Sequence, residues 1–251
     1  MSSKKIGKIG KAKEGKKSNV IEMPKRSEVR RVMIGTPSHD GKLDVWYVNS
    51  LLSTLSLCSQ NRIAVFPIFL SYDALIQRAR NDLFAIAFET KVDDLIFIDS
   101  DMEWNPQDFL KILRHPVDVV AGTARKKTDD SEVYALHLKE GEGSFERDPS
   151  NGLVEVEGIG CAFTRFSRKA VRSLWDSSEL YASDGKPARN IFEVKVINGE
   201  LFSEDIVVCR KWAVLGGTVW FDPTITCNHI GVKKYIGNFQ EWEKRVNGGG
   251  R

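Results

Sequence analysis

The stretch "DLIFIDSDMEW" (94–104) decides the fold of this chain and raises the question of its function. Four consecutive apolar residues, Leu95 to Ile98, predict a short buried strand. The strand runs into Asp99 and Asp101, two carboxylates separated by one residue. Two negative charges this close resist burial unless a cation joins them. They therefore either form a solvated turn or are placed to receive a positive ligand.

Strands and helices alternate on both sides of this stretch up to about residue 124. Apolar runs predict strands over 30–38, 62–70 and 117–124, and apolar spacing predicts helices over 48–58, 74–90 and 105–115. The last helix opens with Asn105 as its cap and Pro106 in its first turn. Pro67 argues against a central place for the strand 62–70. The alternation predicts a doubly wound, mostly parallel sheet flanked by helices.

The pattern changes after residue 124. Alternating apolar and polar residues between Gly, Asp and Pro turns predict antiparallel strands over 133–141 and 152–166. A helix over 167–175, a strand over 191–197, a helix from Ser203, a strand over 218–224 and a tail helix over 239–246 are expected to follow. We expect both halves to share one sheet, with residues 29–125 as the nucleotide-binding half and 126–251 as the acceptor half of a single domain.

Composition indicates a soluble globular protein. The chain has 251 residues, of which 41% are apolar and 28% are charged, enough for a well-buried core. Its four cysteines show no C-x-x-C spacing, which argues against a zinc knuckle and favours a reducing compartment. The longest apolar run, 63–70, is too short to span a bilayer, and the N-terminus lacks the apolar core of a secretion signal. We expect a cytoplasmic protein.

Charge is unevenly distributed along the chain. Residues 1–31 hold eleven Lys or Arg against three Glu, whereas the net charge of the whole chain is +3, so the remainder is net acidic. The first segment also has few apolar residues and no periodicity. Residues 1–28 are therefore predicted to form a disordered basic arm ahead of the folded domain 29–251.

Several segments hold the residue types that chemistry needs. Asp99 and Asp101 offer hard oxygen ligands, which suit Mg²⁺ or Mn²⁺ bridging to a diphosphate. His229, just after a predicted strand, could reach the metal or simply fill a core position. Glu204 and Asp205 lie in a first helical turn, where they either stabilise the helix dipole or supply a general base.

Glycines mark one more segment, "GIGCAFTRF" (158–166). Gly158 and Gly160 either let the backbone approach a ligand closely or belong to an ordinary strand turn.

These motifs follow one another in an order that resembles that of a known protein family. "GTPS", "RARND", "FIDSDMEW", "AGTARKK", "EGIGCAFTRF", "FSEDIVVCRKW" and "HIG" follow one another over residues 31–236. This succession resembles the GT-A-fold glycosyltransferases, which transfer a sugar from a nucleotide-sugar, and in particular their short soluble members from bacteriophages and bacteria. The resemblance implies a GT-A-like, Rossmann-like fold with a mixed, mostly parallel central sheet. It also implies host cytoplasm as the location if the chain is phage-encoded.

The resemblance implies roles for individual residues. Asp99 and Asp101 would hold the divalent metal, with Asp101 as the direct ligand and Asp99 nearer the ribose, and His229 would be a further ligand. Glu204 or Asp205 would be the catalytic base, with Asp205 preferred.

The resemblance also implies contacts with the donor. Thr36, Pro37 and Arg80 would contact the nucleotide of a UDP-sugar, whereas Gly158 and Gly160 would face the sugar or the acceptor. A single base opposite the leaving group predicts inversion at the anomeric carbon.

The acceptor is the least constrained part of the prediction. Phage enzymes resembling this chain glycosylate hydroxymethylated pyrimidines in their own DNA, and the arm from Lys4 to Lys17 could bind a duplex together with Arg125, Lys126 and Lys127. The arm could equally be a solvated tail, and the triplet could hold donor phosphates. A DNA acceptor is preferred here to a saccharide, lipid-linked or protein acceptor.

Two other classes remain open. A nucleotidyltransferase also uses carboxylate-held metal, but "GTPSHDG" (35–41) is not a convincing Gly-rich phosphate loop. A non-enzymatic nucleic-acid-binding protein would use the basic arm and leave the carboxylates incidental.

Overall fold

The computed structural model describes residues 29–129, 131–138, 145–183 and 185–248. The predicted basic arm lies outside them. Its helices are α1 (Val45–Gln60), α2 (Ile76–Thr90), α3 (Pro106–Arg114), α4 (Arg168–Ser177), α5 (Glu204–Val214) and α6 (Phe239–Gly248). Its strands are β1 (Arg30–Ser38), β2 (Ile63–Ser71), β3 (Asp94–Ile98), β4 (Met102–Glu103), β5 (Val119–Ala124), β6 (Leu136–His137), β7 (Val154–Val156), β8 (Gly158–Ile159), β9 (Phe163–Ser167), β10 (Leu180–Ser183), β11 (Lys186–Arg189), β12 (Lys195–Ile197), β13 (Glu200–Phe202), β14 (Val219–Ile230) and β15 (Lys234–Tyr235).

The main sheet joins both halves of the chain. Its order is β15-β14-β5-β9-β3-β1-β2, with β4 and β7 also paired to β14. Strands β2, β1 and β3 are parallel neighbours, as are β5 and β14, while β9 runs antiparallel between β3 and β5. The predicted class, a mixed and mostly parallel α/β sheet flanked by helices, is confirmed. Strand β9 is antiparallel to both of its neighbours, so β3 and β5 run in the same direction. The carboxyl ends of β1, β3, β5 and β14 therefore all lie at one edge of the sheet.

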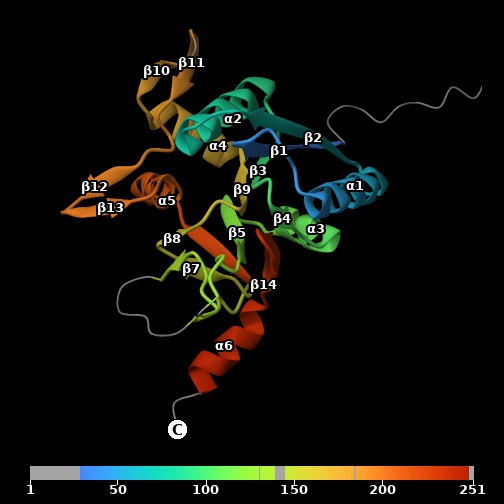
Figure 1. Ribbon diagram of the computed structural model, residues 1–251. Helices are drawn as coiled ribbons and strands as arrows, with labels where there is room; N and C mark the ends of the chain where they lie inside the picture. The colour runs from blue at the N-terminus through green and yellow to red at the C-terminus, as the bar shows by residue number, and fades with distance from the viewer. Residues whose placement is uncertain (1–28, 130, 139–144, 184, 249–251) are drawn as a thin grey trace, which may run out of the picture.

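Helices cover both faces of this sheet (Figure 1). One core packs α2, α4 and α5 against the sheet, and the other packs α1 and α3 against its opposite face. Strand β3 shows why its sequence is continuously apolar: Leu95 and Phe97 belong to one core, Ile96 and Ile98 to the other, and all four are fully buried. This double burial holds the backbone that leads into Asp99.

The predicted secondary structure agrees with the observed elements in the first half of the chain. Strand β1 occupies the predicted residues, and α3 begins as expected with Asn105 accepting a hydrogen bond from the amide of Gln107. Strand β2 lies at the edge of the sheet, where its Pro67 costs no ladder hydrogen bond to a second neighbour.

The second half departs from its predictions. Of the predicted strand 191–197 only Lys195–Ile197 is a strand, paired in a hairpin with β13 away from the main sheet. The reason is that the amides of Ile191 and Phe192 donate to the side-chain oxygen of Asn81 instead of to a neighbouring strand. The predicted strand 133–141 is reduced to Leu136–His137 among its described residues.

Strand β14 is longer than predicted and continues to Ile230. A register shift between Phe221 and Thr226 accommodates Pro223. As a result, β14 carries His229 to the edge where β3 ends.

Candidate functional site

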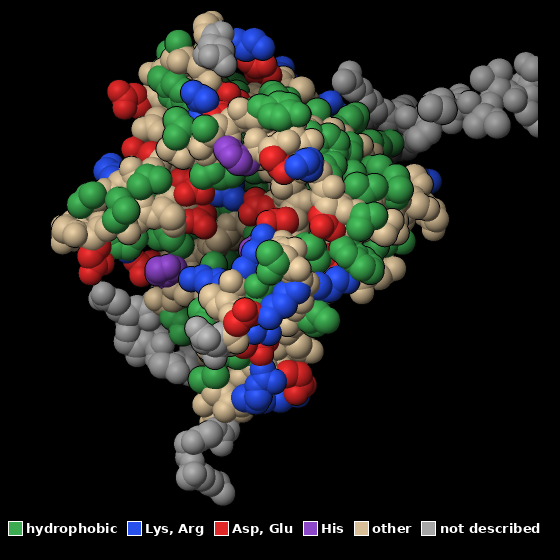
Figure 2. Space-filling view, in the orientation of Figure 1, with side chains coloured by type: hydrophobic (Ala, Val, Ile, Leu, Met, Phe, Trp, Pro, Cys, Tyr) green, Lys and Arg blue, Asp and Glu red, His purple; other side chains and the backbone are tan. Residues whose placement is uncertain are grey.

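Most of the predicted site residues come from elements that meet at the carboxyl edge of the sheet. A cavity of about 340 Å³ lies there, lined by residues that follow β3 and β5, precede β9, end β14 and begin α2 and α5. Figure 2 shows acidic, basic and histidine side chains gathered around a hollow near the middle of this face. The cavity is lined by Arg80, Asp99, Gly160, Glu204, Asp205 and His229, among other residues.

One side of the cavity is built around a buried arginine. Arg80, on α2, donates to the Glu204 carboxylate at the start of α5, and its other terminal nitrogen donates to Asp99 Oδ1 at 3.0 Å. The Arg80 side chain is only 5% exposed, and that of Glu204 11%. Burial raises the pKa of Glu204, and the attraction of Arg80 offsets this only in part. Because both ends of its guanidinium are engaged by carboxylates, Arg80 acts as the link between β3 and α5.

Asp205 has a different environment from its neighbour Glu204. Its Oδ1 accepts hydrogen bonds from the Ser203 hydroxyl and from the amide of Ile206. Its Oδ2 lies 3.4 Å from the position that a side chain on Gly160 would occupy. Ser203 occupies the N-cap position of α5, but its hydroxyl donates to the Asp205 carboxylate and makes no side-chain bond to the helix amides. One carboxylate oxygen of Asp205 therefore faces the cavity beside Gly160.

On the other side, Asp101 does not line the cavity itself but lies against His229, which does. Its Oδ2 accepts from Lys127 Nζ at 2.5 Å and lies 3.5 Å from His229 Nε2. Burial acts to raise the pKa of Asp101, but the hydrogen bonds from His229 and Lys127 outweigh it and hold the pKa below its ordinary value. The Asp101 side chain is 37% exposed, so this side is open to solvent.

Asp101 and His229 are the two residues on this side that could ligate a divalent metal. His229 Nδ1 lies 3.1 Å from the backbone oxygen of Arg125, which can only accept, so Nδ1 carries the proton. Nε2 faces the Asp101 carboxylate, which Lys127 Nζ already contacts, so a metal held by Asp101 and His229 would displace that ammonium group. Within the described residues no three His, Cys, Asp or Glu side chains are grouped to hold a metal ion. Two protein ligands suffice for Mg²⁺ or Mn²⁺ when substrate phosphates complete the shell.

Other predicted site residues lie elsewhere. Thr36 is fully buried, and its hydroxyl is hydrogen-bonded to the Tyr47 hydroxyl at 2.6 Å, so it faces the core. Pro37 lines a separate cavity of about 200 Å³ between β1 and α2. Gly158 packs against Ile206 of α5, where a side chain would come within 2.9 Å of the Ile206 side chain. The structure therefore brings together Arg80, Asp99, Asp101, Gly160, Glu204, Asp205 and His229, and leaves out Thr36, Pro37 and Gly158.

Sequence reasoning missed two features of the cavity. Lys127 belongs to a basic triplet that was expected to hold phosphates or DNA, and its bond to Asp101 had no sequence signal. Cys161 lies in the cavity wall beside Arg80, and burial raises the pKa of its thiol well above the ordinary range. All four cysteines are buried and unpaired. None of the described helices is long and apolar enough to cross a membrane.

Comparison with known proteins gives distant structural similarities. No protein-family model and no curated protein matches the chain. Among solved structures, the chain is similar to A197 from STIV, at 18% identity over 81% of this chain and 86% of that one, with a TM-score of 0.48.

Two further solved structures are also similar. The inositol-1-phosphate CTP transferase from T. maritima shares 10% identity over 79% of this chain and 86% of that one, with a TM-score of 0.40. TarS 1–349 from S. aureus, in complex with UDP-GlcNAc, shares 14% over 58% and 47%, with a TM-score of 0.34. Similarities this distant do not assign a family or an activity.

Proposed function

We propose that this chain is a metal-dependent glycosyltransferase that moves a sugar from a nucleotide-sugar, expected to be a UDP-sugar, to a hydroxyl acceptor. One observation carries the proposal: a single cavity is lined both by His229, whose Nε2 lies against Asp101, and by Asp205, whose Oδ2 faces Gly160. The cavity lies at the carboxyl edge of an open α/β sheet, where nucleotides bind in such folds. A nucleotide-sugar reaction needs both charge neutralisation and a base.

The donor side would be held by residues of β3, β14 and the segment after β5. Asp101 and His229 would hold Mn²⁺ or Mg²⁺, and the bound metal would offset negative charge on the departing diphosphate. Asp99 stays nearer the ribose in this proposal. Lys126 lines the cavity and Lys127 already lies against Asp101, so both are placed to move onto donor phosphates.

The acceptor side would use Asp205 as the general base. Its Oδ2 faces the cavity, whereas Glu204 is tied to Arg80 and would position rather than react. Asp205 would take the proton from the acceptor hydroxyl as its oxygen attacks the anomeric carbon and the bond to the diphosphate breaks. A single attack of the acceptor oxygen, assisted by one base, predicts inversion of configuration at the anomeric carbon. Gly160 keeps the space beside Asp205 clear.

A panel of nucleotide-sugars with and without Mn²⁺ tests this proposal. Release of the nucleoside diphosphate is expected with at least one donor, in the presence of metal, and is expected to be lost in Asp101→Ala. If no donor is cleaved, or if Asp101→Ala cleaves as well as the parent protein, the chain is not a glycosyltransferase of this kind. Such a result would favour a non-enzymatic nucleic-acid-binding protein.

The DNA acceptor needs a separate test, because the basic arm lies outside the described residues. Labelled donor sugar should pass to DNA containing hydroxymethylated pyrimidines and not to ordinary DNA. Deletion of residues 1–25 should weaken DNA binding and reduce its dependence on salt while leaving donor cleavage intact. A saccharide acceptor is favoured by a second cavity described below.

A further inference from the structure

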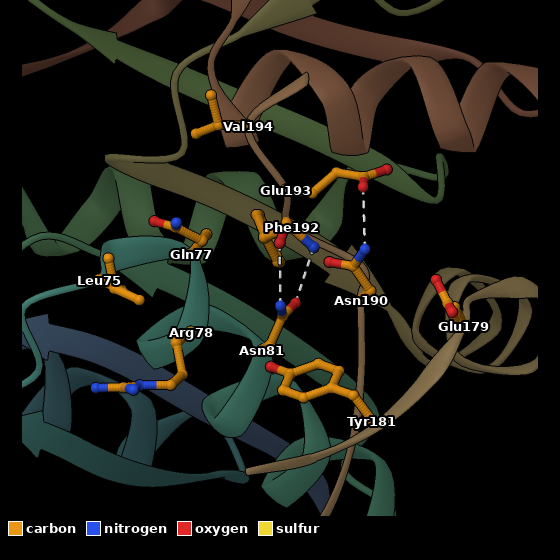
Figure 3. A pocket seen from close by; sticks show the side chains of 10 residues that line it. All are labelled: Leu75, Gln77, Arg78, Asn81, Glu179, Tyr181, Asn190, Phe192, Glu193 and Val194. Carbon is orange, nitrogen blue, oxygen red and sulfur yellow. Dashed lines mark hydrogen bonds between the residues drawn. The ribbon is translucent and has the colours of Figure 1, made fainter. Parts of the chain in front are cut away.

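A second cavity, of about 420 Å³, lies beside α2 and is bounded on its other side by the segment that follows α4 (Figure 3). Its wall on the α2 side presents Gln77, Arg78 and Asn81, and its other wall includes Tyr181 and Asn190. This volume falls within the range of small-molecule sites, about 300–1,000 Å³.

The second cavity adjoins the candidate active site across α2. Ile76 and Arg80, four residues apart, line the active-site cavity, whereas Gln77 and Asn81 line the second one. Neighbouring residues are about 100° apart around a helix of 3.6 residues per turn, so these two pairs form adjacent stripes. A ligand long enough to cross the N-terminal half of α2 could therefore occupy both cavities.

The wall of the second cavity is preformed. Asn81, only 2% exposed, donates from Nδ2 to the backbone oxygen of Phe192 at 3.0 Å. Its Oδ1 accepts from the amides of Ile191 and Phe192, at 3.1 and 2.8 Å, and these bonds are drawn in part in Figure 3. Phe192 is fully buried. A helix side chain thus fixes the facing segment, which keeps the cavity open without a ligand.

The charges of this cavity disfavour a polyanion. Its single arginine, Arg78, is held by Asp73 through two hydrogen bonds of 2.8 and 2.7 Å. Glu193 pairs with Lys211 at 2.8 Å, and the exposed Glu179 makes no ion pair with any described residue. DNA is held through Lys and Arg contacts to its phosphates, and this lining offers none to spare.

The remaining polar groups suit hydroxyls. Gln77 supplies an amide, Glu179 a carboxylate, and Asn190 an amide oxygen, its nitrogen being bonded to Glu193. The half-buried ring of Tyr181 adds an apolar surface, and its hydroxyl is hydrogen-bonded to Asn81. We propose that this cavity binds a neutral, polyhydroxylated acceptor such as an oligosaccharide, and presents its terminal hydroxyl to Asp205. The assignment as acceptor rests on the proposed glycosyltransferase function, but sugar binding itself does not.

Saturation-transfer NMR with chitotetraose, maltotetraose and cellotetraose tests this proposal without any donor. At least one of these sugars is expected to bind the full chain. Glu179→Lys and Tyr181→Ala should each weaken that binding about tenfold, because each removes a polar contact. Glu200→Lys makes the same charge change at an exposed site on β13 and should bind like the parent protein.

The outcomes separate the two proposals. If no oligosaccharide binds, or if both cavity variants bind like the parent protein, this inference is wrong. Glu179 is exposed, so Glu179→Lys should fold even where Tyr181→Ala does not, and thermal melting checks both. If sugars bind but no donor is cleaved in the nucleotide-sugar panel, only the transferase fails. If hydroxymethylated DNA is glycosylated and the oligosaccharides do not bind, DNA is the acceptor.

Discussion

Asp99 and Asp101 are separated by one residue in the chain, yet their carboxylates have different partners. Asp99 bonds to a fully buried arginine, which also holds Glu204, whereas Asp101 bonds to a partly exposed lysine and a histidine. The dry side is the Arg80–Glu204 pair, whose two side chains are only 5% and 11% exposed. The Asp101 side is wet, and its cation can be replaced by a ligand. Burial, and not charge alone, decides which side is scaffold and which side is open to chemistry.

The largest effect should come from breaking the dry side. Arg80→Ala leaves Glu204 buried without its counter-ion, so the free energy of unfolding should fall by about 3–5 kcal/mol. Urea denaturation measures this. Arg172→Ala, at an exposed position on α4, is the control and should change stability by less than about 0.5 kcal/mol. A small loss in Arg80→Ala would mean that the buried pair does not hold α5 to the sheet.

The next effect concerns catalysis at the boundary between the two sides. Asp205→Asn removes the proposed base but keeps the shape of the side chain, so the transfer rate should fall by about a hundredfold or more. Stability should change little by comparison with Arg80→Ala. Asp176→Asn, on the exposed surface of α4, should transfer sugar at the parent rate. Full activity in Asp205→Asn would exclude it as the base.

A smaller effect, on metal affinity, is expected at the Asp101 side. Lys127→Ala removes the ammonium group that competes for Asp101, so Mn²⁺ affinity should rise by about fivefold, since exposed ion pairs contribute up to about 1 kcal/mol. Titration calorimetry measures the affinity, with Lys186→Ala on β11 as a matched exposed control. Unchanged or weaker Mn²⁺ binding in Lys127→Ala would contradict the role of Asp101 as a metal ligand.

The smallest effect is a difference in pH dependence between the two sides. Burial raises the pKa of Glu204 above 4.5, so the folded state holds a proton that the unfolded state has lost, and stability should fall as pH rises above 4.5. Asp101 has a lowered pKa, held down by His229 and Lys127 against burial, so its contribution is present above 3.8 and lost as pH falls below it.

Urea unfolding of Glu204→Gln and Asp101→Asn across this pH range measures both slopes. Relative to the parent protein, Glu204→Gln should gain stability as pH rises, and Asp101→Asn should gain it as pH falls. Slopes of the same sign in the two variants would show that the two sides do not differ in this way.

Local sequence signals predicted the first half of the fold well and the second half less well. Strand β1 and helix α3 follow from an apolar run and from an Asn–Pro start, both of which act within a few residues. Segment 191–197 has the composition of a strand, but its first amides bond to Asn81, more than a hundred residues earlier. A propensity read over a short window cannot anticipate a partner so far away.

The candidate site shows the same limit. The motifs alone singled out Asp99, Asp101, Glu204, Asp205 and His229, and all of them meet at the predicted edge of the sheet. They also singled out Thr36, whose hydroxyl turns to Tyr47 in the core, and Gly158, which packs on α5. The sequence identified the residue types, but not which of them face the cavity.

By itself, the sequence determined the class of sheet and the edge at which the carboxylates gather. The reason is that a short run of apolar residues, such as "LIFI" (95–98), is enough to specify a strand buried between two layers of helices. Only the tertiary structure decided how the charges are paired. Arg80 meets Glu204 across 124 positions of the chain, and Lys127 meets Asp101 across 26. Such pairs depend on how distant elements pack and on how far each charge is withdrawn from water, and no local pattern encodes either.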